Sequence, residues 1–154
     1  MAIAITDALR GEHGVLYRLL DHLERETPAA TLERAREQGA CLAAALEAHA
    51  QLEDELLFGA LAGVLDETSG PLVVMRQEHE AIERDLVALR TAGDVAAARQ
   101  LAARLVGTAR DHFAKEEQIL FPLAERLLGA GQLVALGERW AERSSVAISG
   151  CSCC

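Results

Sequence analysis

The chain has 154 residues, which is enough for one domain with its own hydrophobic core. Its formal net charge of −9 argues against a nucleic-acid-binding surface, which needs clustered Lys and Arg. No apolar run approaches the ~20 residues of a membrane span, so we expect no membrane partner. The chain is rich in Ala, Leu, Glu and Arg, all strong helix formers, and this composition predicts an all-α protein. Its first residues lack the layout of a signal peptide, so we expect it to be cytoplasmic.

Apolar residues recur at helical spacing in four long segments, and each segment has start and stop signals. The first helix is expected to end at Glu26 and to begin at Thr6 or Asp7, either of which would be its N-cap. The second helix is expected over residues 31–65, with Thr31 as a weak cap.

The third helix is expected from Pro71, a favoured first position in helices, to about Gly93. The fourth is expected to begin after the cap Asp94 and to run to about Leu128. Pro122 lies within the fourth helical pattern, so we expect a kink there.

A short fifth helix is expected from Gln132 to about Arg143, with Trp140 as a lid or a dimer contact. The predicted fold is therefore an up-down-up-down four-helix bundle with a short C-terminal fifth helix, formed by one domain over residues 1–143. Residues 144–154 are predicted to be an unstructured tail. The tail carries the cysteines Cys151, Cys153 and Cys154. They are expected to be thiols in a reducing compartment, either on a flexible end or able to reduce a metal centre, hold a soft metal or exchange disulfides.

Two identical His-x-x-x-Glu motifs occur in the second and fourth helices, as His49–Glu53 and His112–Glu116. Residues four apart lie on one face of an α-helix, about 6 Å apart along its axis. Each motif therefore directs an imidazole and a carboxylate to the same place.

The motifs belong to an internal repeat, because Glu12-His13 in the first helix is matched by Glu78-His79 in the third. The chain is two copies of one helical hairpin. A bundle of two such hairpins has pseudo-twofold symmetry, which would bring all four histidines to one level.

A single histidine on an apolar stripe is more often a core residue than a ligand, but buried charges almost always need a partner or a metal. The repeated pattern therefore predicts a site for two transition-metal ions. Its predicted ligands are His13, His49, Glu53, His79, His112 and Glu116. Imidazoles would be terminal ligands, and Glu53 and Glu116 are best placed to bridge the ions. Such ligands favour iron first and then manganese, and zinc could substitute for them.

Several neighbouring residues have alternative interpretations. Glu83, four residues after His79, is either an occasional ligand, an acid beside the site or a solvated residue. Tyr17 either donates a hydrogen bond to a metal-bound oxygen species or simply packs, and we favour packing. His22 should face solvent.

Three further acidic residues near the motifs are expected to be surface charges: Asp54, Glu55 and Glu117. Phe58 and Phe121 are expected to form an apolar layer beside the site that limits the access of water. If the helical period stays constant after each glutamate, three later residues face the core of the bundle: Ala60, Ile119 and Leu123.

With these motifs, the sequence resembles the hemerythrin-like family with the HHE cation-binding domain. The resemblance covers about residues 7–128. It implies a four-helix bundle that holds two Fe ions, bridged by carboxylates and by oxo or hydroxo groups, with the six residues named above as ligands. The oxygen-carrying hemerythrins take a fifth histidine from a His-x-x-x-His pair in the third helix, where this chain has Glu83, so reversible oxygen carriage is not expected.

Three functions fit the sequence. The first is a di-iron redox protein that acts on O2, H2O2 or NO, as an enzyme, detoxifier or sensor in oxidative or nitrosative stress. The second is an O2 or iron store, or an iron sensor, without catalytic turnover. The third is a metal-free helical interaction module. The sequence decides neither whether the protein is an enzyme nor whether it is a monomer or a homodimer.

Overall fold

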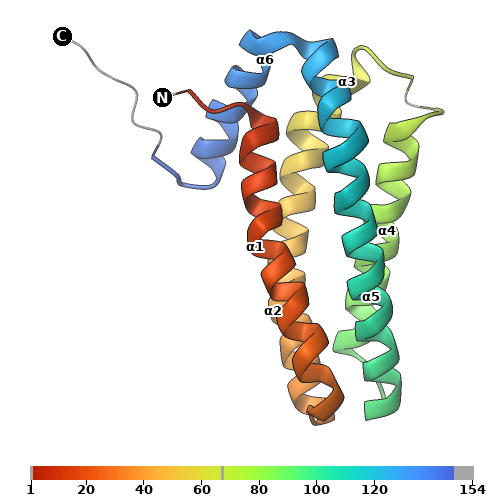
Figure 1. Cartoon of the computed structure of the whole chain (residues 1–154). Coiled ribbons are helices and arrows are strands. Elements are labelled where there is room, and N and C mark those ends of the chain that lie inside the picture. Colours follow the sequence, from red (N-terminus) through yellow and green to blue (C-terminus); the bar gives the residue numbers. More distant parts are fainter. Residues whose placement is uncertain (1, 67, 148–154) are drawn as a thin grey trace.

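The computed structural model describes residues 2–66 and 68–147, which form helices and no strand. Helical columns run alternately down and up the molecule, as predicted (Figure 1). In chain order the elements are α1 (Ile5–Glu26), η1 (Thr27–Ala29), α2 (Leu32–Leu52), η2 (Glu53–Phe58), α3 (Gly59–Ala62), α4 (Pro71–Arg90), α5 (Val95–Lys115), η3 (Glu116–Leu120) and α6 (Phe121–Arg143). The second column consists of α2, η2 and α3, and the fourth of α5, η3 and the start of α6.

The predicted starts of the second, third and fourth helices agree with the structure, and the predicted start of the first does not. Thr31 and Asp94 each accept a hydrogen bond from the backbone N–H three residues later, at 3.2 and 2.8 Å, and this confirms both caps. The cap expected at Thr6 or Asp7 is wrong, because α1 already begins at Ile5 and no side chain caps it.

The second and fourth columns each change to a π-helix at a candidate ligand. The segment η2 begins at Glu53 and η3 begins at Glu116. A π-helical turn holds more residues than an α-helical turn, so it shifts every later residue round the helix. Such turns occur frequently at functional sites.

This shift corrects three of the predicted core positions. Leu61 is fully buried, whereas Ala60 is only partly buried. Ile119 is 58% exposed and the next residue, Leu120, is buried. Likewise Ala124 is buried in place of Leu123. In each case the buried residue lies one position later than a constant helical period requires.

The bend expected at Pro122 lies elsewhere. Pro122 is in the first turn of α6, directly after the π-helical turn, and the backbone leaves the helical conformation at Gly129, with φ 73° and ψ 159°. A positive φ favours glycine, which has no Cβ to clash. This break lies where the fourth helix was predicted to end, after Leu128. The residues beyond it, up to Arg143, belong to the same element α6, so a separate fifth helix from Gln132 is not confirmed.

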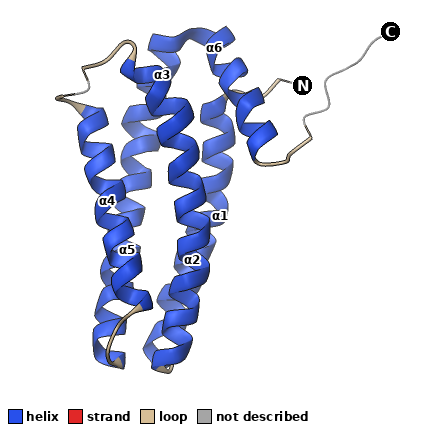
Figure 2. Cartoon of the chain, turned by 180° about the vertical axis from the view of Figure 1, so that it is seen from behind, coloured by secondary structure: helices blue, strands red, loops and turns tan. Residues whose placement is uncertain are grey.

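After Gly129, α6 turns over the end of the bundle and returns beside α1 (Figure 2). Gly137 allows this close approach, because a Cβ there would overlap the carbonyl oxygen of Ile3. Trp140 was expected to be a lid or a dimer contact. Its indole N–H donates to Glu12 Oε1 at 2.7 Å, which fastens α6 to α1.

Two apolar clusters fill the bundle, one toward each end. On α1, Leu9 belongs to one cluster and Leu16 to the other, and His13 lies between them. On α4, His79 lies in the same way between Met75 and Ile82. The candidate metal site is therefore a polar layer enclosed by apolar side chains on both sides.

Among the described residues, one helical stretch is long and apolar enough to cross a membrane by length and composition. It is Val95–Arg143, with a mean hydropathy of 1.4 over its most apolar window. Core helices of soluble proteins meet the same criterion. In this structure the stretch contains the fourth column of the bundle, with His112 and Glu116, and the part of α6 that returns beside α1 after Gly129.

Candidate metal centre

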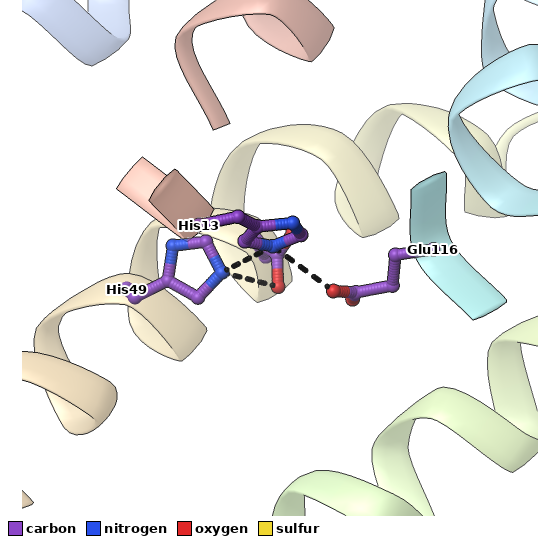
Figure 3. A group of neighbouring side chains, drawn as sticks. His13, His49 and Glu116 are labelled. Atoms are coloured by element: carbon purple, nitrogen blue, oxygen red, sulfur yellow. Dashed lines mark hydrogen bonds and ion pairs between the residues drawn. The ribbon is translucent and has the colours of Figure 1, made fainter. Parts of the chain in front are cut away.

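The structure brings the six predicted ligands together at one level of the bundle. The four histidines come from four different helices, α1, α2, α4 and α5, and the two glutamates begin η2 and η3. Figure 3 shows how His13, His49 and Glu116 converge. His79 is 11% exposed and the other five side chains are at most 4% exposed.

These side chains form two groups that could each hold a metal ion. One contains His13 and His49, the other contains His79 and His112, and both contain Glu53 and Glu116. Within each group the four candidate donor atoms lie within 4.8 Å of one another. The two glutamates are thus the shared members, which is the position that a bridging carboxylate requires.

Each histidine faces the centre with its Nε2 atom. His49 Nε2 lies 3.3 Å from Glu53 Oε2, and His79 Nε2 lies 3.5 Å from the same oxygen. His112 Nε2 is 3.2 Å from Glu116 Oε1. His13 Nε2 is 3.3 Å from the other oxygen of Glu116.

The two glutamates are buried without hydrogen bonds. Both side chains are 0% exposed, and neither oxygen of Glu53 or Glu116 receives a hydrogen bond from a described residue. Native proteins seldom leave buried carboxylates without hydrogen bonds, because desolvation of a charge costs several kcal/mol or more, and the histidine Nε2 atoms that face these oxygens balance the charge only when they are protonated. A cation between the glutamates would remove this cost.

Four outer carboxylates hold the Nδ1 atoms of the histidines. Glu12 Oε2 lies 2.6 Å from Nδ1 of His49, and Glu78 Oε2 lies 2.9 Å from Nδ1 of His112. Glu78 also pairs with Lys115. Both outer glutamates directly precede a histidine of the site in the sequence.

The other two outer carboxylates were predicted to be surface charges, and the prediction missed their contacts with the site. Asp54 is exposed as predicted, at 44%, but its Oδ1 also lies 3.4 Å from Nδ1 of His79. Glu117 is 34% exposed, and its Oε1 lies 2.9 Å from Nδ1 of His13. Each directly follows a candidate ligand glutamate. That shared place in both repeats is a sequence signal by which they could have been found. Glu55, the third residue of this set, pairs with Arg143 at the surface, as expected.

These contacts orient the imidazoles. An ionised carboxylate can only accept a hydrogen bond, so Nδ1 of His13, of His49 and of His112 carries the hydrogen, and in the neutral form of each ring the lone pair is on Nε2. The Nε2 atoms of His13 and His49 lie only 3.1 Å apart. Two lone pairs at this distance repel unless a proton or a metal ion lies between them, and two nitrogens bound at right angles to one metal ion by bonds of about 2.1 Å would lie about 3 Å apart. The donor set therefore fits a metal ion.

Aromatic rings cover the histidines. The predicted apolar layer is confirmed, since Phe58 stacks on His79 with ring centres 5.4 Å apart and Phe121 stacks on His13 at 5.5 Å. Phe113, which the sequence did not single out, stacks closer on His13, at 4.3 Å. Tyr17 packs with its ring edge against Phe113, as favoured.

Without metal, protons partly replace the cations. Burial lowers the pKa of His49, but the charge of Glu53 and the hydrogen bond with Glu12 outweigh it and raise this pKa to about 10. Burial likewise lowers the pKa of His79, while Asp54 and Glu53 raise it to about 9. In turn, the pKa of Glu53 is well below its usual value, because His49 and His79 outweigh the effect of its burial.

The remaining candidates lie outside the two groups. His22 is exposed, as predicted, and Cys41 is an exposed free thiol. Glu83 is exposed and belongs to neither ligand group. The cysteines of the C-terminal tail lie outside the described residues.

Fold and site together define a helical-bundle protein with a buried cluster of histidines and glutamates suited to cations. The comparison with protein families agrees: the Hemerythrin HHE cation binding domain matches residues 4–124, so the chain belongs to this family. No curated protein and no solved structure matches the chain at a significant level.

Proposed function

We propose that this protein is a cytoplasmic non-haem di-iron protein that reacts with or senses O2, peroxide or nitric oxide. The observation that carries the proposal is the sharing of Glu53 and Glu116 by two groups of donor atoms. Neutral imidazole and carboxylate donors suit iron, and manganese and zinc are its closest substitutes. When bound, the iron pair would supply redox chemistry toward these small molecules.

The side chains around the site would serve such a function in two ways. The outer carboxylates orient the imidazoles, and the rings of Phe58, Phe113 and Phe121 exclude water from most of the layer. Two pockets reach the site: one of about 380 Å³ is lined by His49, His79 and His112, and one of about 580 Å³ is lined by His49. Both histidines of the second ligand group line a pocket, whereas His13 of the first group lines neither, so the second group is the more accessible one to a small molecule.

Metal analysis and spectroscopy test this proposal together. The full chain is purified, loaded anaerobically with ferrous iron, analysed for metal, and its absorption spectrum is recorded before and after O2, H2O2 and NO. We expect about two irons per chain and a spectral change with at least one of the three reagents. His79→Ala should hold less iron, and the exposed control His22→Ala should hold as much as the unmodified chain.

The outcomes separate the candidate functions. Iron that is bound but unreactive would favour storage or iron sensing. No bound iron, manganese or zinc would mean that the histidines are structural and that the protein is a helical interaction module.

A further inference from the structure

A pocket of about 380 Å³ between α2 and α4 leads from the surface to the candidate metal centre. It is lined by three of the four site histidines: His49, His79 and His112. His112 is 1% exposed, and its Nε2 has no hydrogen-bond partner among the described residues. The pocket therefore reaches a buried histidine of the site whose Nε2 faces Glu116 without a hydrogen bond.

Carboxylates dominate the outer part of the lining. Four of them line the pocket, namely Glu47, Asp54, Glu55 and Glu83, and among the described residues no Lys or Arg does, so positive charge in the lining comes from the inner histidines. Glu47 and Glu55 each contact an arginine, and Asp54 contacts His79. Glu83 makes no ion pair or hydrogen bond within the part of the chain that the structure describes. It lies one turn after His79 on α4.

Donor groups follow one another from the surface to the centre with falling exposure. Glu83 is exposed, Asp54 is 44% exposed, His79 is 11% exposed and Glu53 is 0% exposed. His79 connects the last two steps, with Nδ1 at 3.4 Å from Asp54 and Nε2 at 3.5 Å from Glu53. A divalent cation that gives up its water would meet an oxygen or nitrogen donor at each stage.

We propose that this pocket is the route by which divalent cations enter the site, with Glu83 as the first carboxylate that they meet. The proposal rests on the metal-binding function proposed above. A cleft lined by charges of one sign raises the local concentration of ions of the opposite sign and so their rate of association. Glu83 is free to serve as a transient ligand, since no ion pair among the described residues occupies it.

A second pocket also reaches the site but has the wrong charge for this role. It measures about 580 Å³ and touches Glu12 and His49 from the side of α1. Its only carboxylate is Glu12, which is already bonded to His49 and Trp140, and Arg143 contributes a positive charge to the lining. Although this pocket is larger, it offers a cation no free acidic group.

The rate of cation uptake tests the route, and equilibrium occupancy tests the site. Metal-free full-length protein is mixed with cobaltous ion in a stopped-flow instrument, and the visible absorption of bound cobalt is followed at several salt concentrations. We expect Glu83→Gln to take up cobalt about 3- to 10-fold more slowly, with a weaker dependence on salt, and to reach the same final occupancy. Glu26→Gln, the same change at an exposed site near the far end of α1, should behave like the unmodified chain.

A steric pair of variants tests the route without a change of charge. Ala50 lines the acidic pocket and Ala48 lines the second pocket, on either side of His49. Ala50→Phe should slow uptake, and Ala48→Phe should not.

The results distinguish two kinds of failure. Unchanged uptake by both Glu83→Gln and Ala50→Phe would overturn the route while leaving the metal site intact. A lower final occupancy in Glu83→Gln would also overturn it, since Glu83 would then be a permanent ligand. If the unmodified chain binds no cobalt, both the route and the proposed metal centre fail.

Discussion

Replacement of Glu12 by glutamine should weaken metal binding, although Glu12 touches no metal in our proposal. Glu12 accepts two hydrogen bonds, from Trp140 at Oε1 (2.7 Å) and from His49 Nδ1 at Oε2 (2.6 Å). Glutamine has a single oxygen, so its NH2 group must face one of these two donors. If it faces His49, the imidazole moves its hydrogen to Nε2, the atom that points at Glu53.

The expected loss of metal affinity follows from the orienting role of the carboxylate–histidine hydrogen bond. Loss of a carboxylate that orients a metal-bound histidine typically costs 10- to 100-fold in metal affinity, which is about 1.4 to 2.7 kcal/mol. Competition titrations with a metal-binding dye would measure it for cobaltous and ferrous ions. Glu24→Gln is the control, because Glu24 lies on the same helix and, among the described residues, bonds only Arg110 at the surface. The reasoning is refuted if Glu12→Gln binds metal as tightly as this control.

The four outer carboxylates should contribute unequally to metal affinity. Glu12, Glu78 and Glu117 lie 2.6 to 2.9 Å from their histidines and are 19 to 34% exposed, whereas Asp54 lies at 3.4 Å and is 44% exposed. Solvent weakens exposed electrostatic contacts. Asp54→Asn should therefore have the smallest effect on equilibrium affinity, within about threefold. An equal loss in all four variants would show that distance and exposure do not govern the contribution.

Three other predictions concern occupancy and stability. Elemental analysis should find sharply lower metal content in Glu53→Ala and in Glu116→Ala, and no decrease in His22→Ala. Equal metal content in all three variants would overturn the ligand assignment. Metal at 100 times its dissociation constant should stabilise the fold by about 2.7 kcal/mol and raise Tm by roughly 5 to 10 °C; calorimetry that finds no change on metal removal would contradict metal binding. In the metal-free chain, the pKa of His49 is raised to about 10 and the pKa of His79 to about 9, and both values exceed the unfolded value of 6.5. Their contribution to stability is complete below about pH 6.5 and is lost as the pH rises through about 9 to 10, so urea unfolding should require less denaturant at pH 10 than at pH 7. A metal-free chain equally stable at both pH values would argue against this charge pairing.

The sequence allowed the prediction of the six inner residues because they combine two independent signals. The spacing of four in His49–Glu53 and in His112–Glu116 places each pair on one face of a helix whatever its neighbours do. The repetition of the pattern in both halves then implies two facing hairpins, and the structure places these residues together. Neither signal depends on knowing how the helices pack.

The register after each glutamate could not be predicted in the same way. Each glutamate is followed within five residues by an apolar run: Leu56, Leu57 and Phe58 after Glu53, and Ile119, Leu120 and Phe121 after Glu116. Each residue of these runs is therefore apolar enough to face the core. Apolar periodicity cannot locate an extra residue within such a run. The π-helical turns became visible only in the structure, which buries Leu120 and exposes Ile119.

The outer carboxylates were missed for a different reason. Asp54 and Glu117 lie next to a core glutamate in sequence, and an amphipathic pattern assigns such charged residues to the solvated face. Their role depends on a partner from another helix, His79 on α4 and His13 on α1. Single-helix periodicity contains no information on that partner.

The repeat predicts two equivalent halves, and the structure shows where they differ. His13 is 0% exposed, lies between the rings of Phe113 and Phe121, and is held by Glu117 at 2.9 Å. Its counterpart His79 is 11% exposed, has the longer contact with Asp54 and lines the acidic pocket. Since an aspartate is one methylene shorter than a glutamate, this substitution in the repeat leaves His79 less constrained. If both groups bind a metal ion, the two positions should therefore differ in access although their inner donor sets are the same, and we expect exchange with solvent at the position held by His79 and His112.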